Sequence, residues 1–231
     1  MLTKMNPANW FRRKPKQTEP SVTELPVTRP TIENSSEVVG TERKPEEKKP
    51  PNIPVMKPSP IFPRYKYRSP GKPAAGKRNE AEPFVTGGIR AQKDRRLADA
   101  LAAYRQAVKL DPSFYEANYN MALVAREVGD LSVALAAYEQ ALAILPESIN
   151  ARYNFAFTLQ EAGYFHDAEN ELQKLLAQNP NETRAHLLLG NLCAQRLNQN
   201  SVAREHYLKV LEAEPQHPQA TQIRYWLAAH S

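Results

Sequence analysis

The stretch LSVALAAYEQALAILP, residues 131–146, decides the fold of this chain. Its small and apolar side chains recur at steps of one, three and four residues: Ala134, Tyr138, Ala141, Leu142 and Leu145. Residues at this spacing share one face of an α-helix. Pro146 then ends the helix, because proline has no backbone N–H to donate. Ala134 is small, which predicts that a neighbouring helix approaches closely at that point.

This unit recurs along the chain. Its prolines, Pro112, Pro146, Pro180 and Pro215, are 34, 34 and 35 residues apart. Three further columns share these spacings: Ala100, Ala134, Ala168 and Ala203; Tyr104, Tyr138, Leu172 and Tyr207; Ala107, Ala141, Leu175 and Val210. The single extra residue falls within residues 198–201. A lone helix pair cannot bury its own apolar face, so consecutive units are expected to stack.

Each unit holds another helix upstream of the one quoted above. In residues 115–128 the inward positions again follow helical spacing and include Met121 and Ala122. Gly129-Asp130 marks the turn between the two helices, and Gly163 marks the same turn in the next unit. Each unit is therefore predicted to be a pair of helices joined by a short turn.

The pattern resembles the tetratricopeptide repeat (TPR), a 34-residue unit with the consensus W-x2-L-G-x2-Y, A-x3-F and P. Three copies are clear in residues 115–217. The L-G and A-x3-F pairs of the consensus correspond to Met121-Ala122, Phe155-Ala156 and Leu189-Gly190, and to Ala134/Tyr138, Ala168/Leu172 and Ala203/Tyr207. Asn118, Arg152 and His186 stand where the family has tryptophan. The resemblance implies an all-α fold, a right-handed solenoid of helical hairpins.

The resemblance also sets the domain boundaries. Residues 81–231 form the TPR domain, with repeats at 81–114, 115–148, 149–182 and 183–217 and a capping helix at 218–229. The first repeat is degenerate, because Gly87-Gly88 occupies its L-G position. Two glycines cost a helix about 2 kcal/mol relative to alanine. We therefore expect the leading helix of this repeat, about residues 81–92, to be frayed.

Residues 1–80 differ in composition from the rest. They contain 14 of the 20 prolines and 17 Lys+Arg against 8 Asp+Glu, a net charge of +9. The remaining residues carry 14 basic against 17 acidic side chains, so the basic character of the chain belongs to this tail. Dense proline and few large apolar residues predict a disordered Pro-rich basic tail over residues 1–80.

Two patches in the tail interleave aromatic and basic residues: Trp10–Lys14 and Ile61–Arg68. Such patches can stack on bases, contact an anionic membrane or dock on a protein groove. The alternative, a solvated linker that carries a few aromatics by chance, stays open for both. The second patch is the stronger candidate, because it lies near the repeats and holds four large apolar residues in eight.

No residue pattern indicates catalysis, a metal or a cofactor. The five histidines form no pair at helical spacing, and Cys193, the one cysteine, lies in a predicted core column. The glutamates are expected to lie on solvated repeat surfaces. No run of 18 apolar residues and no signal-peptide pattern occurs in the sequence, and together with the single cysteine this favours a cytoplasmic location. The sequence therefore predicts that the chain is not an enzyme.

The candidate binding surface is the inner face of the first helix of each repeat, where stacked repeats form a concave groove. Steps of three and four residues align on this face a set that we call the inner stripe: Glu116, Tyr119, Asn120, Leu123, Arg126, Asn150, Tyr153, Asn154, Phe157, Gln160, Arg184, Leu187 and Asn191. The resemblance implies that Asn120 and Asn154 hydrogen-bond a peptide backbone. Because tyrosines stand where a carboxylate clamp needs cations, no such clamp is expected. The alternative, consensus asparagines that simply face water, stays open.

Two functions follow from these patterns. The first is a scaffold whose groove binds a peptide or helix of a partner protein. The second is binding of nucleic acid or an anionic surface by the basic tail, with the repeats serving for presentation or oligomerisation; such binding collapses at higher salt. The segment Ile61–Tyr67 is a candidate occupant of the groove in the free protein, because a tether gives it an effective concentration of about 1 mM.

Overall fold

The computed structural model describes residues 62–230. Residues 1–61 and Ser231 lie outside the described residues, and with them most of the predicted disordered tail and the whole Trp10–Lys14 patch. The described residues form helices joined by short turns, preceded by an extended segment. None of the helices within 62–230 is long and apolar enough to cross a bilayer.

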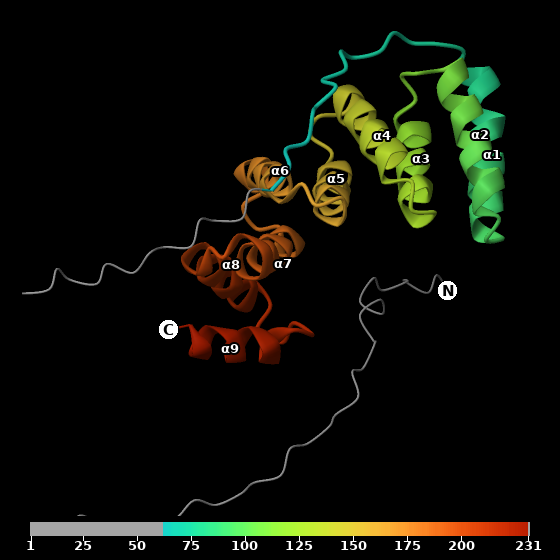
Figure 1. Ribbon diagram of the computed structural model, residues 1–231. Coiled ribbons are helices and arrows are strands. Elements are labelled where there is room, and N and C mark those ends of the chain that lie inside the picture. Colours follow the sequence, from blue (N-terminus) through green and yellow to red (C-terminus); the bar gives the residue numbers. More distant parts are fainter. Residues whose placement is uncertain (1–61, 231) are drawn as a thin grey trace, which may run out of the picture. The chain divides into compact units, whose positions relative to one another are not determined.

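The helices pack as sequential hairpins, as the repeats predict (Figure 1). The first helix of each hairpin packs against the second, and each second helix packs against the first helix that follows. The hairpins are α1 (Arg78–Lys93) with α2 (Leu97–Leu110), α3 (Tyr115–Glu127) with α4 (Leu131–Ile144), α5 (Ile149–Glu161) with α6 (Phe165–Gln178), and α7 (Thr183–Leu192), extended by η2 (Cys193–Leu197), with α8 (Asn200–Ala213). A last helix, α9 (Ala220–Ala229), follows. The all-α prediction is confirmed.

The alanine column marks the close approach of helices. Ala100, Ala134, Ala168 and Ala203 are each fully buried. The capping helix α9 packs on the last hairpin through larger side chains. Ile223 is buried, and the centre of the Trp226 ring lies 5.0 Å from that of Tyr207.

The leading helix of the first repeat is complete and does not match the frayed helix expected from Gly87-Gly88. It runs without interruption over Arg78–Lys93. Gly88 is buried against Tyr104, and a Cβ added to Gly88 would lie 2.6 Å from the Tyr104 ring. Gly190 faces Tyr207 in the same way in the last repeat. The propensity cost of the glycine is thus offset by the space that it leaves for a buried tyrosine.

Each hairpin turn contains one residue in the left-handed backbone region. Gly129 and Gly163 have φ values of 86° and 84°, while Arg95 and Asn198 take the same role with 62° and 54°. Glycine suits this region because it has no Cβ to clash with the backbone. The predicted turns at Gly129 and Gly163 are confirmed.

The extra residue of the last repeat, which the sequence places within residues 198–201, is absorbed by the backbone just upstream of that range. In the second and third hairpins a backbone bond closes the turn over five residues, as from Asp130 N to Ala125 O at 2.8 Å. In the last hairpin the bond runs from Gln199 N to Cys193 O over six residues, at 2.9 Å. Residues Cys193–Leu197 form a π-helical turn. The insertion therefore widens the end of the first helix, a common form of a π-bulge.

Polar side chains stand where the family has tryptophan, and they form hydrogen bonds to the backbone at the turns between repeats. Asn118 donates to the carbonyl of Pro112 at 3.1 Å, and Arg152 donates to that of Pro146 at 2.6 Å. His186 Nε2 lies 2.8 Å from the carbonyl of Pro180. All three thus satisfy a carbonyl that the chain reversal leaves without a helical partner.

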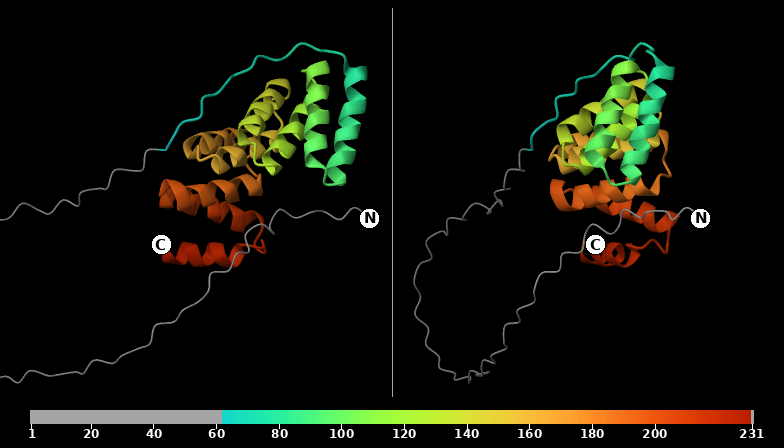
Figure 2. Two further views of the ribbon diagram at one scale, coloured as in Figure 1. Left: turned by 45° about the vertical axis from the view of Figure 1, so that its right-hand side comes forward. Right: turned by 90° about the vertical axis from the view of Figure 1, so that its right-hand side faces the viewer.

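Residues 62–77, which we call the strap, run back along the array in an extended conformation. The strap passes from α6 to the start of α1, as Figure 2 shows for the teal segment. Its described contacts lie on α4, α5, α6 and the junction between α2 and α3. This part of the chain, assigned from the sequence to the disordered tail, makes specific contacts with the repeats.

Candidate binding surfaces

The inner stripe lies on the first helices of three successive hairpins. Its residues come from α3, α5 and α7, and α3 contacts α5 as α5 contacts α7. Glu116, Asn150 and Arg184 are exposed, and the other members are half-buried. None of the predicted residues is fully buried, so the structure places the whole stripe on a surface.

Side chains of the stripe join neighbouring helices. Asn154 Nδ2 donates to the Tyr119 hydroxyl at 3.0 Å, between α5 and α3. The Arg126 guanidinium lies 5.0 Å from the centre of the Phe157 ring, and that of Arg184 lies 5.2 Å from the centre of the Tyr153 ring. The stripe is thus a continuous aromatic surface with cations over two of its rings.

The two asparagines of the stripe differ. The amide nitrogen of Asn154 is engaged by Tyr119, whereas the Asn120 side chain makes no hydrogen bond to any residue in 62–230. Burial raises the pKa of Tyr119, so the phenol keeps its proton and can donate to a ligand. Both asparagines are predicted to bind a peptide backbone, and of the two only Asn120 has an amide with no partner in residues 62–230.

A buried hydroxyl beside the stripe has no acceptor. Tyr138 is fully buried, its ring lies 6.2 Å from that of Tyr119, and its Oη has no hydrogen-bond partner among the described residues. In the first hairpin the equivalent Tyr104 donates to Gln92 Oε1 at 3.2 Å. Arg126 occupies the position of Gln92 in the second hairpin, and a guanidinium cannot accept. Gln160 Oε1, in the third, is likewise buried and unpaired.

A second surface lies under the strap, on the second helices. It contains Glu139 of α4 with Asp167 and Glu171 of α6, which are 6%, 2% and 2% exposed. The expectation that the glutamates face solvent is wrong for Glu139 and Glu171, because the strap covers them. We call these three carboxylates and the strap residues on them the strap site.

The carboxylates bind the strap mainly through its backbone. Tyr65 N donates to Asp167 Oδ2 at 2.8 Å, and Arg68 N donates to Glu139 Oε1 at 3.1 Å. Side chains add to this, with Arg64 Nη2 at 3.1 Å from Asp167 Oδ1 and the Tyr67 hydroxyl at 3.3 Å from Glu171 Oε1. Hydrogen bonds to a carboxylate are stronger than those between neutral groups.

Aromatic rings fill the rest of the strap site. Phe62 meets Phe165 edge to face at 4.7 Å, and Tyr65 meets Tyr164 at 5.3 Å. Tyr67 packs on Phe155, 6.1 Å away between ring centres. Edge-to-face pairs at such distances are favourable beyond simple burial.

The strap site corrects the predicted occupant of the groove. Of the segment Ile61–Tyr67, the structure describes residues 62–67 and places them on α5 and α6 rather than on the inner stripe. Asp167 accepts from Arg64 and from a backbone N–H group of this segment, and aromatic rings pack on its tyrosines.

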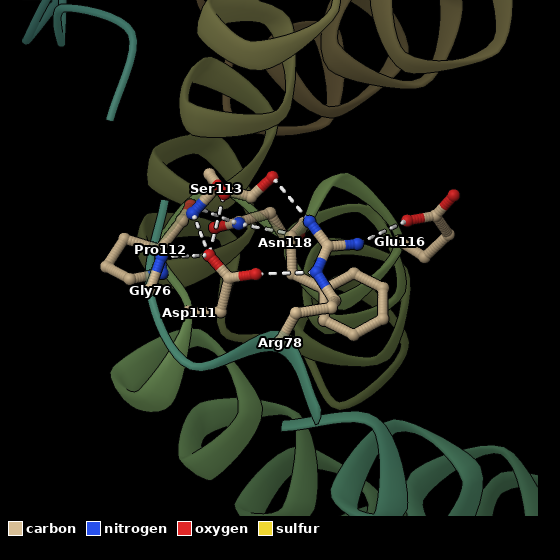
Figure 3. Close-up of polar contacts among 8 residues, drawn as sticks. Gly76, Arg78, Asp111, Pro112, Ser113, Glu116 and Asn118 are labelled. Carbon is tan, nitrogen blue, oxygen red and sulfur yellow. Dashed lines mark hydrogen bonds and ion pairs between the residues drawn. The ribbon is translucent and has the colours of Figure 1, made fainter. Parts of the chain in front are cut away.

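The other end of the strap is fixed at the joint between α2 and α3, centred on Asp111 (Figure 3). Asp111 Oδ1 accepts from Gly76 N at 3.0 Å, and Oδ2 accepts from Arg78 Nε at 2.6 Å. Burial would raise the pKa of Asp111, but hydrogen bonds from Ser113, Arg78 and backbone N–H groups lower it to about 2. The Arg78 guanidinium also lies 3.7 Å from the centre of the Phe114 ring.

The last hairpin holds a histidine pair that spacing within one helix did not reveal. His186 Nδ1 of α7 lies 2.9 Å from His206 Nδ1 of α8. Among residues 62–230, no group of three or more His, Cys, Asp or Glu side chains could hold a metal ion. Cys193 is buried as expected, and burial raises the pKa of its thiol to about 12. Such a thiol stays protonated and unreactive.

Comparisons with known proteins agree with this fold. Models of the tetratricopeptide repeat match residues 86–149 and 125–192, and the chain belongs to the tetratricopeptide repeat family. The family is generally non-catalytic, and its members typically mediate protein–protein interactions. A comparison with curated proteins gives no match.

Solved structures are similar in fold. A tetratricopeptide repeat protein from Parabacteroides merdae ATCC 43184 has 24% identity and a TM-score of 0.61, over 66% of this chain and 60% of that one. YrrB, a TPR protein with an unusual peptide-binding site, has 24% identity and a TM-score of 0.56, over 65% and 75%. MamA from Desulfovibrio magneticus RS-1 has 24% identity and a TM-score of 0.56, over 61% and 78%. At these identities the similarity concerns the fold alone.

Proposed function

We propose that the chain is a non-catalytic scaffold whose inner stripe binds an extended or helical segment of a partner protein. The observation that carries this proposal is a surface of half-buried aromatics that includes an amide without a partner. Tyr119, Tyr153 and Phe157 line it, and the Asn120 side chain has no hydrogen-bond partner among the described residues.

The chemistry of the stripe defines the ligand. Aromatic rings take apolar side chains, and the Asn120 amide offers both a donor and an acceptor to a peptide bond. Arg126, which also lies 3.8 Å from Glu161, can donate to an acceptor of the ligand such as a backbone carbonyl. The fold neighbour YrrB has a peptide-binding site, which supports this class of ligand. A cytoplasmic location, compatible with the one buried cysteine, is part of the proposal.

The double variant Tyr153→Ala/Phe157→Ala tests the proposal. Burying one such ring contributes about 1.5–3 kcal/mol, so losing two should weaken binding at least about 100-fold. Partners captured by the full chain are identified by mass spectrometry, and their binding segments are then measured by calorimetry as synthetic peptides. The matched control is Leu208→Ala/Tyr225→Ala, which removes two exposed apolar side chains from α8 and α9.

Affinity should fall for the stripe variant and stay unchanged for the control, measured at a temperature at which circular dichroism shows both variants to be fully folded. The proposal is wrong if the stripe variant keeps its affinity and deletion of residues 1–61 abolishes partner binding. In that case the basic tail, and not the groove, binds the partner.

A further inference from the structure

Among the described residues, two carboxylates of the strap site receive all their hydrogen bonds from the strap. Glu171 is neutralised by the helices themselves, through Arg152 at 2.8 Å and Lys174 at 2.8 Å. Glu139 and Asp167 have no such partner, since within residues 62–230 their donors all come from the strap. If the strap left, these two carboxylates would be uncovered and would exchange the strap's hydrogen bonds for bonds to water, while the aromatic rings beneath the strap would lose their cover.

We propose that this face of α4, α5 and α6 is a second peptide-binding site, with the strap as its resident occupant. Its ligand from a partner protein is an extended segment that alternates aromatic and basic residues, as Phe62–Arg68 does. The proposal is separate from the inner stripe and does not depend on it.

Backbone recognition makes the site a receptor for extended chains in general. Asp167 and Glu139 accept from two backbone N–H groups three residues apart, those of Tyr65 and Arg68. These bonds do not depend on side-chain identity, so any extended segment with free N–H groups at this spacing can make them. Recognition of an extended peptide through its main chain, with pockets for alternate side chains, is a recurrent mode of peptide binding.

Side-chain contacts supply the selectivity. Phe62, Tyr65 and Tyr67 each meet an aromatic ring of α5, α6 or the turn between them. Arg64 adds an ion pair to Asp167, but its side chain is 59% exposed, so water and salt screen that pair. Selectivity therefore rests on the aromatic positions, while the carboxylates of Glu139 and Asp167 disfavour acidic segments.

The strap is built to exchange. It makes no strand ladder, and residues 69–75 make no hydrogen bond in the described part of the chain. Its other end stays attached at Asp111 through Gly76 and Arg78. A tether of this kind gives the strap an effective concentration of about 1 mM. A partner segment must compete with the strap at this effective concentration. Only a segment that binds the site more tightly than the strap does can displace the strap at a lower concentration.

The experiment uses a fluorescent peptide with the sequence of residues 60–69, PIFPRYKYRS, as the probe. The receptors are the full-length wild-type chain and the full-length variant Tyr65→Ala/Tyr67→Ala, in which the strap has lost its rings. Fluorescence anisotropy should show saturable binding to the variant at least about 10-fold tighter than to the wild type. Absence of saturable binding to the variant would overturn the proposal.

Changes on the probe keep the test independent of receptor folding. A probe with glutamate in place of its first arginine, the equivalent of Arg64→Glu, should bind the variant at least about 10-fold more weakly. Equal binding of both probes would overturn the assigned chemistry. On the receptor side, adding Asp167→Asn should weaken binding, while adding Glu212→Gln, an exposed carboxylate of α8, should not.

Two further measurements separate the alternatives. Adding Tyr153→Ala/Phe157→Ala to the receptor should leave probe binding unchanged. The proposal for the strap site and the proposal for the inner stripe can therefore each be disproved without affecting the other. Analytical ultracentrifugation should give the same oligomeric state for the wild-type chain and for the Tyr65→Ala/Tyr67→Ala variant. A dimer that forms only in the wild type would mean that the strap of one copy binds the other copy. Such a dimer would overturn the assignment to a partner protein in favour of strap exchange between two copies of this chain.

Discussion

The inner stripe and the strap site lie on opposite members of the same hairpins and differ in how their polar groups are paired. The stripe on α3, α5 and α7 presents Arg126 and Arg184 over its aromatics, with Glu161 and Glu182 beside them. The strap site on α4 and α6 presents Glu139 and Asp167, which bind the strap, whereas Asn120 of the stripe has no hydrogen-bond partner in residues 62–230.

This difference follows from what the chain itself can supply. The strap is basic and aromatic, so it complements the carboxylates and aromatic rings of α4, α5 and α6. One surface is therefore filled within the molecule, and no described segment outside the helices is seen to cover the other. Surfaces that depend on common packing should fail together, whereas independent surfaces should change one at a time.

The largest effect should come from Ala168→Leu, which disturbs both surfaces together. Ala168 is fully buried in α6, the helix that pairs with α5 of the stripe and carries Asp167 of the strap site. Extra methylenes in a well-packed contact cost about 1–3 kcal/mol, and Ala134→Leu should behave alike. Urea unfolding measures this, with the exposed Ala177→Leu as the control. An unchanged unfolding midpoint for Ala168→Leu would mean that the column does not mark close packing.

The next effect should separate the surfaces. Asp111→Ala removes the acceptor of Gly76, Arg78 and Ser113, and leaving such donors unpaired costs about 1–3 kcal/mol. Limited proteolysis should cut residues 62–77 faster in this variant, while a ligand of the inner stripe binds as before. Asp94→Ala, an exposed carboxylate, is the control. Equal cleavage rates in the variant and the wild type would mean that the strap does not depend on this anchor.

The same anchor should respond to pH in a defined window. The pKa of Asp111 in the folded chain is about 2, below its ordinary value of 3.8. A lowered carboxyl pKa stabilises the folded state above the unfolded value and stops doing so as the pH falls through the folded one. Strap protection at Asp111 should therefore persist down to about pH 4 and be lost toward pH 2.

A smaller effect should reach only the far end of the stripe. His186 Nε2 donates to the Pro180 carbonyl, which leaves Nδ1 to accept from His206 Nδ1. Burial lowers the pKa of His206, and the charge of His186 lowers it further. Because the unfolded chain then binds protons more readily, stability should fall as the pH drops below about 6.5.

His206→Phe tests this by removing the titrating group. It should cost roughly 0.5–1.5 kcal/mol at neutral pH, the worth of one hydrogen bond, and flatten the dependence of stability between pH 7 and 5. The control is His230→Gln, at an exposed histidine. Equal pH slopes in His206→Phe and the wild type would contradict the assigned pair.

The stripe and the strap site also differ in how far the sequence predicts them. Columns such as Ala134 and Ala168 report burial directly, because the same environment recurs every 34 residues. The residues of the stripe can be listed once it is known which face of each first helix points toward the core. The unpaired Tyr138 hydroxyl was missed, although a signal was present, namely the change from Gln92 to Arg126 in one column.

The strap site could not be derived from periodicity. Its hydrogen bonds join residues 71 to 104 positions apart, and an extended segment has no repeat of its own. One signal was the carboxylate of Glu171 in a column that otherwise holds Ala103, Ala137 and His206. The π-helical turn was also out of reach, since an alignment of columns shows that a residue is inserted but not how the backbone absorbs it.

The smallest effect should leave both surfaces intact. Arg95 adopts a φ of 62° in the turn between α1 and α2, where two later turns have glycine. A side chain in the left-handed region costs about 1–2 kcal/mol. Glycine relieves this strain but loses about 0.5–1 kcal/mol through the greater freedom of the unfolded chain. The ion pair of Arg95 with Glu127 is solvent-exposed and contributes little.

Arg95→Gly should therefore stabilise the chain by up to about 1 kcal/mol, measured as a higher urea midpoint. Asn198→Gly, at the matching turn of the last hairpin, should gain less, because asparagine tolerates the left-handed region better than arginine. Asn198 lies outside α3 to α6, and Arg95→Gly removes only the exposed ion pair with Glu127 at the end of α3. Strap protection and ligand binding by the stripe should therefore match the wild type. A lower midpoint for Arg95→Gly would show that the arginine contributes more through its contacts than its backbone strain costs.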